Sequence, residues 1–399
     1  MNRRVALRGG AIALILVVGF VAGIYVDQAF PEYVPYFGHR SVSKVDLSEV
    51  QQAARLIQAD YVDSNVNASK LSQGSVQGLV SSLGDPFTIY FDPAQYKRLL
   101  QSYQGQYTGI GIYLNFSSGS YPAITATVPG SPAAEAGLMA GDQITKVGDR
   151  DTKGITADQA TALIQGAAGT KVTLTISRGG QTMTFTITRA EIQVPTVRSA
   201  TVGNNVLYVR IYQFGAQTSK EFGAALSSGL KGSSGMVLDL RGDPGGFISA
   251  ADDVITQFVT SGETFETRGR SGTDRHQVGA THAAANVPLV VLVDANSASA
   301  SEIVAGSLQV HGRAKLVGTK TFGKGSVQQD FVLADGSDIH LTVERWYLPN
   351  GVTIDHKGLT PDVTVTLAST SDAYDVTQPS LGYAKDAQLN AALSLLAGG

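Results

Sequence analysis

A serine-rich segment, Asn296-Ser-Ala-Ser-Ala-Ser-Glu302, follows an apolar run at 289–293 and leads into an alanine-rich run at 300–310 with helical character. A serine at such a strand-to-helix junction is exposed, and the amino end of the helix stabilises negative charge beside it. These are the requirements of a serine nucleophile. Such a nucleophile still needs a base.

Lysine is one residue type that can supply the base. Lys324 lies between two glycines in Thr321-Phe-Gly-Lys-Gly-Ser-Val-Gln328, a stretch with few charges that permits close packing against another loop. The free pKa of lysine, about 10.4, must fall by several units, and burial lowers it because burial penalises the charged form. The alternative is an ordinary solvated lysine in a turn.

Other catalytic groups are poorly supported by the sequence. No histidine motif lies near the serine cluster, and no Gly-x-Ser-x-Gly occurs anywhere, so a Ser/His/Asp arrangement is disfavoured. The chain has no cysteine, which removes thiol nucleophiles, disulfides and cysteine-type zinc sites. No two of its six histidines have the i, i+4 spacing of a metalloprotease helix. We therefore predict no metal site and no cofactor.

A second segment, Asp239-Leu-Arg-Gly-Asp-Pro-Gly-Gly246, stands at the end of the apolar run 235–240. Loops at the carboxyl ends of strands carry the chemistry of α/β sheets, and Gly245 and Gly246 would bring bare N–H groups to a developing oxyanion. A plain Asp-Pro-Gly turn explains the same residues. The segment alone does not decide between the two.

A third segment, Tyr107-Thr-Gly-Ile-Gly-Ile112, suits the binding of a peptide terminus. Its glycines let the consecutive N–H groups of Ile110, Gly111 and Ile112 turn towards one carboxylate, with the peptide added as an extra strand. An ordinary glycine-rich hairpin is the alternative. The following stretch, Ser131-Pro-Ala-Ala-Glu-Ala-Gly-Leu-x-x-Gly-Asp-x-Ile144, is similar to the PDZ modules of bacterial-type proteases. We therefore predict a PDZ domain.

A nucleotide site is suggested by Gly318-Thr-Lys-Thr-Phe-Gly-Lys324, which satisfies most of the Gly-x-x-x-x-Gly-Lys-[Ser/Thr] pattern after a plausible strand at 314–317. Residue 325 is glycine, so the magnesium-binding hydroxyl is missing. The sequence after it has the pattern of a strand and a turn, whereas a phosphate loop leads into a helix. A nucleotide-binding protein remains only as an alternative.

The bulk properties limit partners and location. The chain has 399 residues, long enough for two or three domains, and a net charge of -3 without a basic run, so nucleic acid is not an expected partner. Arg3, Arg4 and Arg8 precede an apolar run at 9–26, near the minimum length for a membrane-spanning helix. The positive-inside tendency places the remainder outside the cytoplasm. A cleaved signal peptide is the alternative, but residues 24–27 make a poor cleavage site.

The texture of the chain predicts its organisation. Helical periodicity begins near Asp46, with Asp46 or Ser48 as N-cap, and returns around residues 71–80. Short β-branched runs with glycine turns fill 105–190, and strands alternate with helices after Pro195, which indicates an α/β core. We expect the following parts: 1–30 cytoplasmic stub and transmembrane anchor, 31–45 spacer, 46–104 N-terminal helical part, 105–190 PDZ domain, 191–366 catalytic core, and 367–399 linker and C-terminal helix.

Taken together, these motifs resemble the C-terminal processing, or tail-specific, peptidases over roughly residues 46–366. The resemblance rests on six motifs: the PDZ segment, the segment 239–246, the serine-rich segment 297–302, Gly84-Asp-Pro-Phe87, Gly323-Lys-Gly-x-x-Gln328 and Gly358-Leu-Thr-Pro-Asp362. It implies an α/β sandwich protease core with an inserted PDZ module. It also implies terminal segments that mediate homodimerisation, and an adaptor protein. The apolar residues Ile110, Ile112 and Leu114 beside the predicted carboxylate site favour protein substrates with apolar C-termini.

The resemblance also assigns roles to individual residues. Ser299 is then the nucleophile, Lys324 the general base, and Gln328 the residue that holds the lysine. The implied oxyanion donors are the N–H groups of Ala300 and of Gly245 or Gly246, and Ser297 and Ser301 are structural. One departure is Gln165, where family members often carry a basic residue, so coupling of the PDZ domain to catalysis is in doubt. An inactive PDZ scaffold or chaperone is a competing function, but the retention of the serine, the lysine and the glutamine together argues against it.

Overall fold

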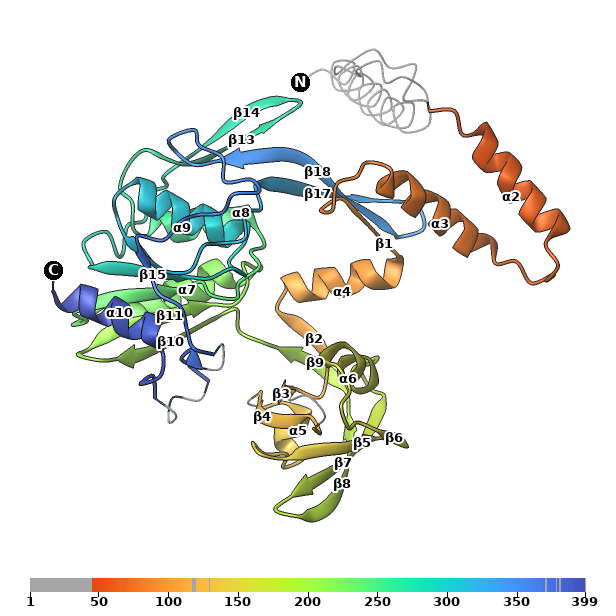
Figure 1. Ribbon diagram of the computed structural model, residues 1–399, viewed down its shortest axis with the longest axis horizontal. Coiled ribbons are helices and arrows are strands. Elements are labelled where there is room, and N and C mark those ends of the chain that lie inside the picture. The colour runs from red at the N-terminus through yellow and green to blue at the C-terminus, as the bar shows by residue number, and fades with distance from the viewer. Residues whose placement is uncertain are drawn as a thin grey trace, which may run out of the picture. The chain divides into compact units, whose positions relative to one another are not determined.

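The protein is described from a computed structural model (Figure 1), which covers residues 45–116, 120–128, 130–369, 372–377, 379 and 382–398. The predicted membrane-spanning segment at 9–26 and nearly all of the predicted spacer lie outside these residues. Within the described ranges, no helix is both long and apolar enough to cross a membrane.

The N-terminal part contains the two predicted helices, α2 (Ser48–Asp60) and α3 (Ala68–Ser81). The predicted N-cap of α2 is wrong: Leu47 occupies the N-cap position and makes no side-chain cap. The Asp46 carboxylate instead accepts a hydrogen bond from the Ser48 N–H (2.9 Å), two residues on, so it closes a local turn before the helix.

A six-stranded sheet forms the centre of the core, in the order β10-β11-β12-β15-β16-β19. β10 pairs antiparallel with β11, and every other pair in this sheet is parallel. The strands are β10 (Val197–Val202), β11 (Val206–Ile211), β12 (Gly235–Asp239), β15 (Leu289–Val293), β16 (Lys315–Gly318) and β19 (Val363–Thr364). Because β12 and β15 are parallel neighbours, the segments that follow them emerge side by side at one edge of the sheet.

Helices cover both faces of this sheet, as the alternation of side chains along each strand requires. On β11, Leu207 and Val209 join the apolar cluster that includes buried residues of α7 (Thr218–Gly229), α8 (Ile248–Thr256) and α9 (Ala300–Val310). The alternate residues Val206 and Tyr208 join a second cluster with α10 (Ala387–Ala397). The core is therefore a helix–sheet–helix sandwich.

A second sheet carries the segment after Lys324. Its longest strand, β18 (Asp338–Tyr347), pairs with β17 along its length and with β1 and β13 towards its two ends. The other strands are β1 (Ile89–Phe91), β13 (Glu263–Gly269), β14 (Gly272–Gln277) and β17 (Ser326–Val332). Helix α4 (Pro93–Tyr103) follows β1 directly, with Asp92 and Gln95 forming a capping box at its start.

Between α4 and β10 the chain forms a β-rich module with its own buried core. The antiparallel pair β2–β9 joins its entry and exit, which is the geometry of an inserted domain. Its elements are β2 (Gln106–Gly109), β3 (Ile112–Asn115), β4 (Ala123–Thr127), α5 (Pro132–Glu135), β5 (Gln143–Val147), β6 (Arg150–Asp151), α6 (Ala157–Ile164), β7 (Lys171–Arg178), β8 (Gln181–Thr188) and β9 (Ala190–Gln193). This is the module expected at 105–190.

Candidate active site

Ser299 lies where the segment after β15 enters α9, as the sequence predicts. It is the N-cap residue of α9 and has φ 54° and ψ -116°, a combination that residues other than glycine rarely adopt. Such a backbone costs about 1–3 kcal/mol and persists only where the surroundings impose it. Its exposed fraction is 9%, so the side chain is largely shielded from water.

The neighbouring serines are held in structural hydrogen bonds. The Ser297 hydroxyl donates to the Leu240 carbonyl (2.8 Å) and accepts from the Asp294 N–H (2.9 Å). The Ser301 hydroxyl donates to the Asp243 carbonyl (3.1 Å). Both fully buried residues thus join the segment after β15 to the segment after β12, on either side of Ser299.

Lys324 lies between β16 and β17, and its side chain is shielded by the segment that precedes β1. Its ammonium stands 5.1 Å from the centre of the Phe87 ring, within cation–π range. Burial lowers the pKa of Lys324 below its usual value, and the Asp85 carboxylate opposes this only in part. The Phe87 ring and the Asp85 carboxylate of this segment favour the charged amine, but burial of Lys324 outweighs them and lowers its pKa.

Glu302 joins the nucleophile and the lysine segments through one buried carboxylate. Its Oε2 accepts hydrogen bonds from the backbone N–H groups of Ser299 (3.0 Å) and Lys324 (2.9 Å). Its Oε1 accepts from the Gly323 N–H (2.8 Å) and the Thr321 hydroxyl (2.5 Å). We call the segments 294–302 and 319–325, joined in this way, the catalytic junction.

Glu302 and Trp346 were not assigned roles from the sequence. The Trp346 indole N–H donates to the Lys324 carbonyl (2.9 Å), so both backbone groups of Lys324 have partners. A signal for Glu302 did exist, because a serine followed three residues later by glutamate is the pattern of a capping box. For Trp346 there was none, since it reaches Lys324 from another strand.

The segment after β12 packs directly against Ser299. A side chain at Gly245, whose φ is +96°, would meet the Ala298 carbonyl oxygen at 2.6 Å and the Ala300 nitrogen at 2.8 Å. The Gly245 N–H donates to Asp243 Oδ1 (2.8 Å), whereas the N–H groups of Gly246 and Ala300 donate to no described residue. Of the three predicted oxyanion donors, Gly246 and Ala300 therefore have unoccupied N–H groups.

A buried ion-pair network fixes the start of the same segment. The Arg241 guanidinium bonds the Asp239 carboxylate (2.6 Å) and the Asp386 carboxylate (2.9 Å), and Asp386 caps α10. Although burial of Asp239 opposes ionisation, Arg241 and Arg210 lower its pKa to about 2. The segment after β12 is thereby joined to the C-terminal helix.

Gln328 lies on β17, beyond the lysine. Its amide donates to the hydroxyls of Ser326 (2.8 Å) and Thr342 (3.0 Å). Neither bond reaches Lys324, so the expected positioning of the lysine by Gln328 stays a prediction.

The segment with the nucleotide-like pattern does not lead into a helix. β16 ends at Gly318, the residues to 325 are irregular, and β17 begins at Ser326. A phosphate loop needs the amino end of a helix directly after it. The structure therefore gives the nucleotide alternative no support.

The turn predicted to hold a carboxylate connects β2 to β3. Gly111 has φ +81° and packs so closely on Ser131 that an added Cβ would stand 2.3 Å from the Ser131 Cβ. Its carbonyl accepts from the Val128 N–H (3.0 Å), while the N–H groups of Ile110 and Gly111 donate to no described residue. We call residues 109–112 the PDZ turn.

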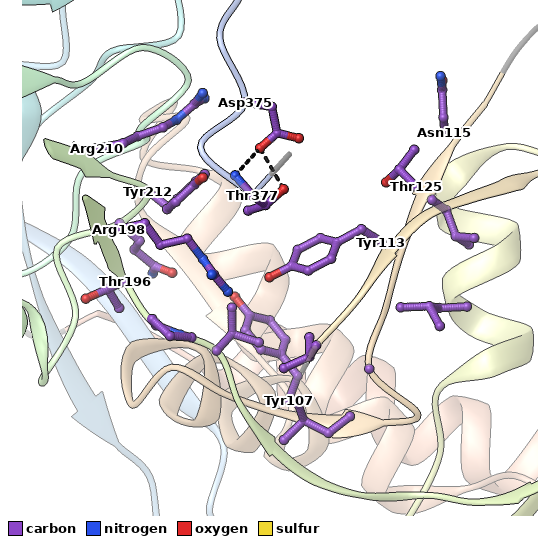
Figure 2. A pocket seen from close by; sticks show the side chains of 18 of the residues that line it. Tyr107, Tyr113, Asn115, Thr125, Thr196, Arg198, Arg210, Tyr212, Asp375 and Thr377 are labelled. Carbon is purple, nitrogen blue, oxygen red and sulfur yellow. Dashed lines mark hydrogen bonds between the residues drawn. The ribbon is translucent and has the colours of Figure 1, made fainter. Parts of the chain in front are cut away.

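A cavity of about 1160 Å³ lies in front of the PDZ turn (Figure 2). It is lined by the PDZ turn and β3, by Ile164 and Gln165 at the end of α6, by residues of β10 and β11 that include Arg198 and Arg210, and by residues from 372–385. Neither Ser299 nor Lys324 lines this cavity. The cavity therefore lies beside the PDZ turn and is separate from Ser299 and Lys324.

Comparison with known proteins agrees with this division of the chain. The model of peptidase family S41 matches residues 205–365, a PDZ domain model matches 124–178, and the model of the activating protease CtpB N-terminal domain matches 36–94. The carboxyl-terminal-processing protease of Synechocystis sp. is 36% identical over 352 residues, covering 86% of this chain and 81% of that protein. The chain belongs to peptidase family S41, among the C-terminal processing peptidases.

Other relatives agree with this assignment. The carboxy-terminal processing protease CtpB of Bacillus subtilis is 34% identical, covering 80% of this chain and 68% of that protein. Among solved structures, a photosystem II D1 C-terminal processing protease has 28% identity and a TM-score of 0.50, covering 79% of this chain and 92% of that one. A putative S41 protease from Bacteroides fragilis has 19% identity and a TM-score of 0.58, covering 90% of this chain and 99% of that one. This similarity is one of fold. The predicted family is confirmed.

Proposed function

We propose that this S41 peptidase is an extracytoplasmic endopeptidase that cleaves with a Ser299/Lys324 dyad and binds the free C-termini of its substrates through the PDZ domain. The observation that carries the proposal is the Glu302 carboxylate, which holds the backbone of Ser299 and that of Lys324 at once. These bonds hold the two segments together, and burial lowers the pKa of Lys324, which favours the neutral amine that a base requires.

In this mechanism, neutral Lys324 accepts the Ser299 hydroxyl proton as the oxygen attacks the substrate carbonyl. The proposed donors to the oxyanion that forms are the N–H groups of Ala300, which follows Ser299, and of Gly246, which follows the Gly245 that packs on Ser299; neither donates to a described residue. Protonated Lys324 then gives its proton to the leaving amine. Water attacks the resulting ester, with Lys324 again as base, and Gln328 is expected to orient the lysine.

The dyad is tested by Ser299→Ala and Lys324→Ala. We expect each variant to lower kcat by at least about 1,000-fold while circular dichroism stays unchanged, because nucleophile and base act as one unit. Lys320→Ala, which removes an exposed lysine from the same segment, is the matched control and should keep the activity. Substantial proteolysis by either dyad variant would contradict the assignment, and an inactive parent would favour the scaffold alternative.

The PDZ turn supports recognition of a free carboxylate, since Ile110 and Gly111 offer unpaired N–H groups to the cavity. Ile112 and Leu114 on β3 also line it and favour an apolar last residue. The basic flank and apolar run at 9–26 support an uncleaved membrane anchor with the catalytic part outside the cytoplasm. Homodimerisation and an adaptor protein remain predictions from the family resemblance.

A further inference from the structure

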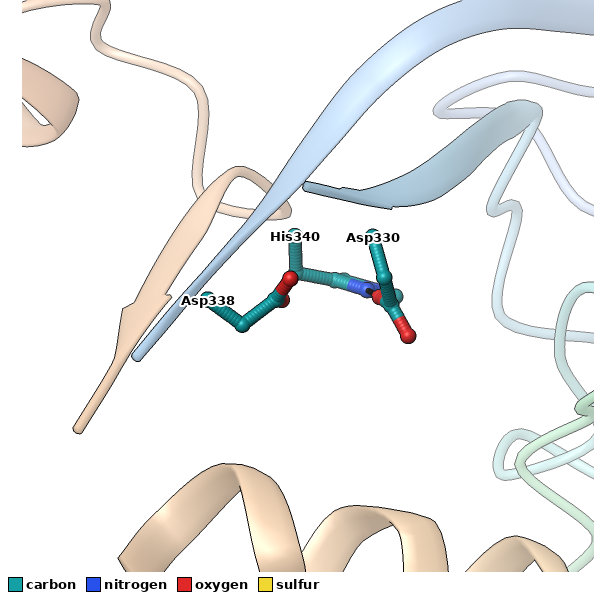
Figure 3. A group of neighbouring side chains, drawn as sticks. All are labelled: Asp330, Asp338 and His340. Carbon is teal, nitrogen blue, oxygen red and sulfur yellow. Dashed lines mark hydrogen bonds and ion pairs between the residues drawn. The ribbon is translucent and has the colours of Figure 1, made fainter. Parts of the chain in front are cut away.

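A group of three metal-binding residue types lies on the β17–β18 hairpin, apart from the catalytic junction. One ligand atom from each of Asp330, Asp338 and His340 lies within 4.8 Å of the others. Asp330 and His340 are directly opposed across the two strands, and Asp338 precedes His340 by two residues on β18. Figure 3 shows the three side chains on the same side of the hairpin.

Asp338 makes this group more than a cluster of acidic residues. Its side chain is fully buried, and neither carboxylate oxygen has a hydrogen-bond partner among the described residues. A buried carboxylate without a partner is costly, and binding a cation is one of the few ways to stabilise it.

Among the described residues, no lysine or arginine neutralises the Asp330 and Asp338 carboxylates. In the described part of the chain, neither Asp330 nor Asp338 forms an ion pair with lysine or arginine, and the His340 Nδ1 lies 2.6 Å from Asp330 Oδ1. The Phe91 ring meets the His340 ring edge to face, with centroids 6.0 Å apart.

From this arrangement we infer that Asp330, Asp338 and His340 form a binding site for one divalent zinc ion. Zinc accepts mixed carboxylate and imidazole ligands, and three protein ligands leave a fourth position for water. Ligands of a tetrahedral zinc ion lie about 2.0–2.1 Å from the metal and hence roughly 3.3 Å from each other. The Asp330–His340 contact therefore has to open slightly and Asp338 to move inwards, which side-chain rotation allows.

The site would act on the hairpin that follows the lysine. Asp330 is two residues beyond Gln328 on β17, and Gln328 pairs with Thr342, two residues beyond His340 on β18. Side chains two residues apart share a strand face. A bound ion would thus cross-link β17 to β18 next to Gln328. It would thereby stiffen β17, the strand that follows Lys324.

The sequence prediction of no metal site rested on histidine pairs spaced for a helix. Here the ligands come from two strands, and only one is a histidine. Their proximity depends on the register of the hairpin, which spacing along the chain does not reveal.

The test uses the full chain with Ser299→Ala, which prevents self-cleavage, after removal of metals with a chelator. Zn²⁺ is titrated calorimetrically, and Tm is measured with and without Zn²⁺. We compare this parent with added Asp338→Asn, with added His340→Gln, and with added Asp274→Asn. The last removes an exposed carboxylate near His276 on another strand and is the matched control.

We expect the parent and the Asp274→Asn control to bind one equivalent of Zn²⁺ and to gain thermal stability from it. Asp338→Asn and His340→Gln should each weaken binding by more than about 100-fold, because even groups that only orient metal ligands account for about 10–100-fold. Without Zn²⁺, Asp338→Asn should melt no lower than the parent, since it removes a buried carboxylate that has no partner.

Three results would overturn the inference. The first is the absence of stoichiometric Zn²⁺ binding by the parent. The second is Zn²⁺ binding by Asp338→Asn that is as tight as binding by the parent. The third is a lower Tm of Asp338→Asn without metal, together with an unchanged rise in Tm on addition of Zn²⁺. The last result would make Asp338 a structural residue only. None of these results bears on the Ser299/Lys324 dyad, which is tested by turnover.

Discussion

The catalytic junction and the PDZ turn are both built around glycines with positive φ, but they use backbone N–H groups in opposite ways. At the junction, the N–H groups of Ser299, Gly323 and Lys324 are bound by the Glu302 carboxylate. At the PDZ turn, those of Ile110 and Gly111 donate to no described residue. At the junction these three donors are satisfied within the chain, whereas the two donors of the turn are left for an acceptor.

This difference follows from what each region has to do. A nucleophile and its base must keep one mutual geometry through the reaction, so a buried carboxylate that binds both segments is useful. A peptide-binding turn gains affinity from donors that only the ligand satisfies. Changes at the junction should therefore lower kcat, whereas changes at the turn should raise KM.

Outside the dyad, the largest effect is expected for Glu302→Ala. Removal of the carboxylate leaves buried donors on both segments unpaired, which lowers stability by about 1–3 kcal/mol each. It also frees Ser299 and Lys324 to shift relative to each other, and because a shift of about 1 Å costs about 100-fold in rate, we expect kcat to fall by more than about 100-fold and Tm to fall as well. The measurements are kcat and thermal unfolding.

Glu221→Ala is the matched control for Glu302→Ala. Glu221 also holds backbone N–H groups, those of Thr196 (2.7 Å) and Val197 (3.0 Å), but away from the dyad. It should lose stability and keep kcat. Equal losses of kcat in the two variants would show that stability, and not the link between the segments, limits turnover.

A smaller but still large effect is expected for Gly245→Ala. The new methyl group would press on Ala298 and Ala300 on either side of Ser299, at a φ of +96° that alanine rarely adopts. Displacing the nucleophile and its N–H donors should lower kcat by about 100-fold, the scale of losing one oxyanion donor. An unchanged kcat in a folded Gly245→Ala protein would show that the segment after β12 does not contribute to catalysis.

Gly111→Ala makes the same change at the PDZ turn. The methyl group would overlap Ser131 at a φ of +81° and turn the N–H donors away from the cavity. We expect KM for a peptide substrate to rise about 10-fold, which is about 1.4 kcal/mol, with kcat nearly unchanged. If kcat fell as much as in Gly245→Ala, the turn would gate the site as well as capture substrate.

Amidation of the substrate terminus should have a comparable or smaller effect on KM, because it removes the charge that strengthens the hydrogen bonds to the turn. Steady-state kinetics on paired free and amidated peptides ending in Ala-Ala provide the measurement. Equal kcat and KM for the two peptides would mean that this PDZ domain does not recognise C-termini.

Much of this architecture could be predicted from the sequence, because the signals were local. The run 300–310 gave α9 with both boundaries correct, since a strand-to-helix junction and a continuous helical pattern coincide there. The β-rich texture of 105–190 gave the PDZ module. The N-cap of α2 was wrong, because Asp46 forms a local turn in place of the cap.

What could not be predicted depends on contacts between distant segments. Nothing in the spacing of Arg241 and Asp386 indicates that they form a buried ion pair. Likewise, the resemblance implied Gly245 or Gly246 as an oxyanion donor, and nothing in the sequence indicated that the Gly245 N–H donates to Asp243. The ligand group on the β17–β18 hairpin depends on strand register. Each of these features follows from tertiary packing.

The pH dependence of kcat/KM tests the central claim, that Lys324 is the base, most directly. Burial lowers the pKa of Lys324 below 10.5, and only the neutral amine accepts the Ser299 proton. The rate should therefore rise with pH, about tenfold per unit well below that pKa, and level off above it along a single deprotonation step. A rate that peaks in acid and falls above neutrality, or a rising limb near pH 6–7 that disappears in a folded histidine variant, would contradict the account.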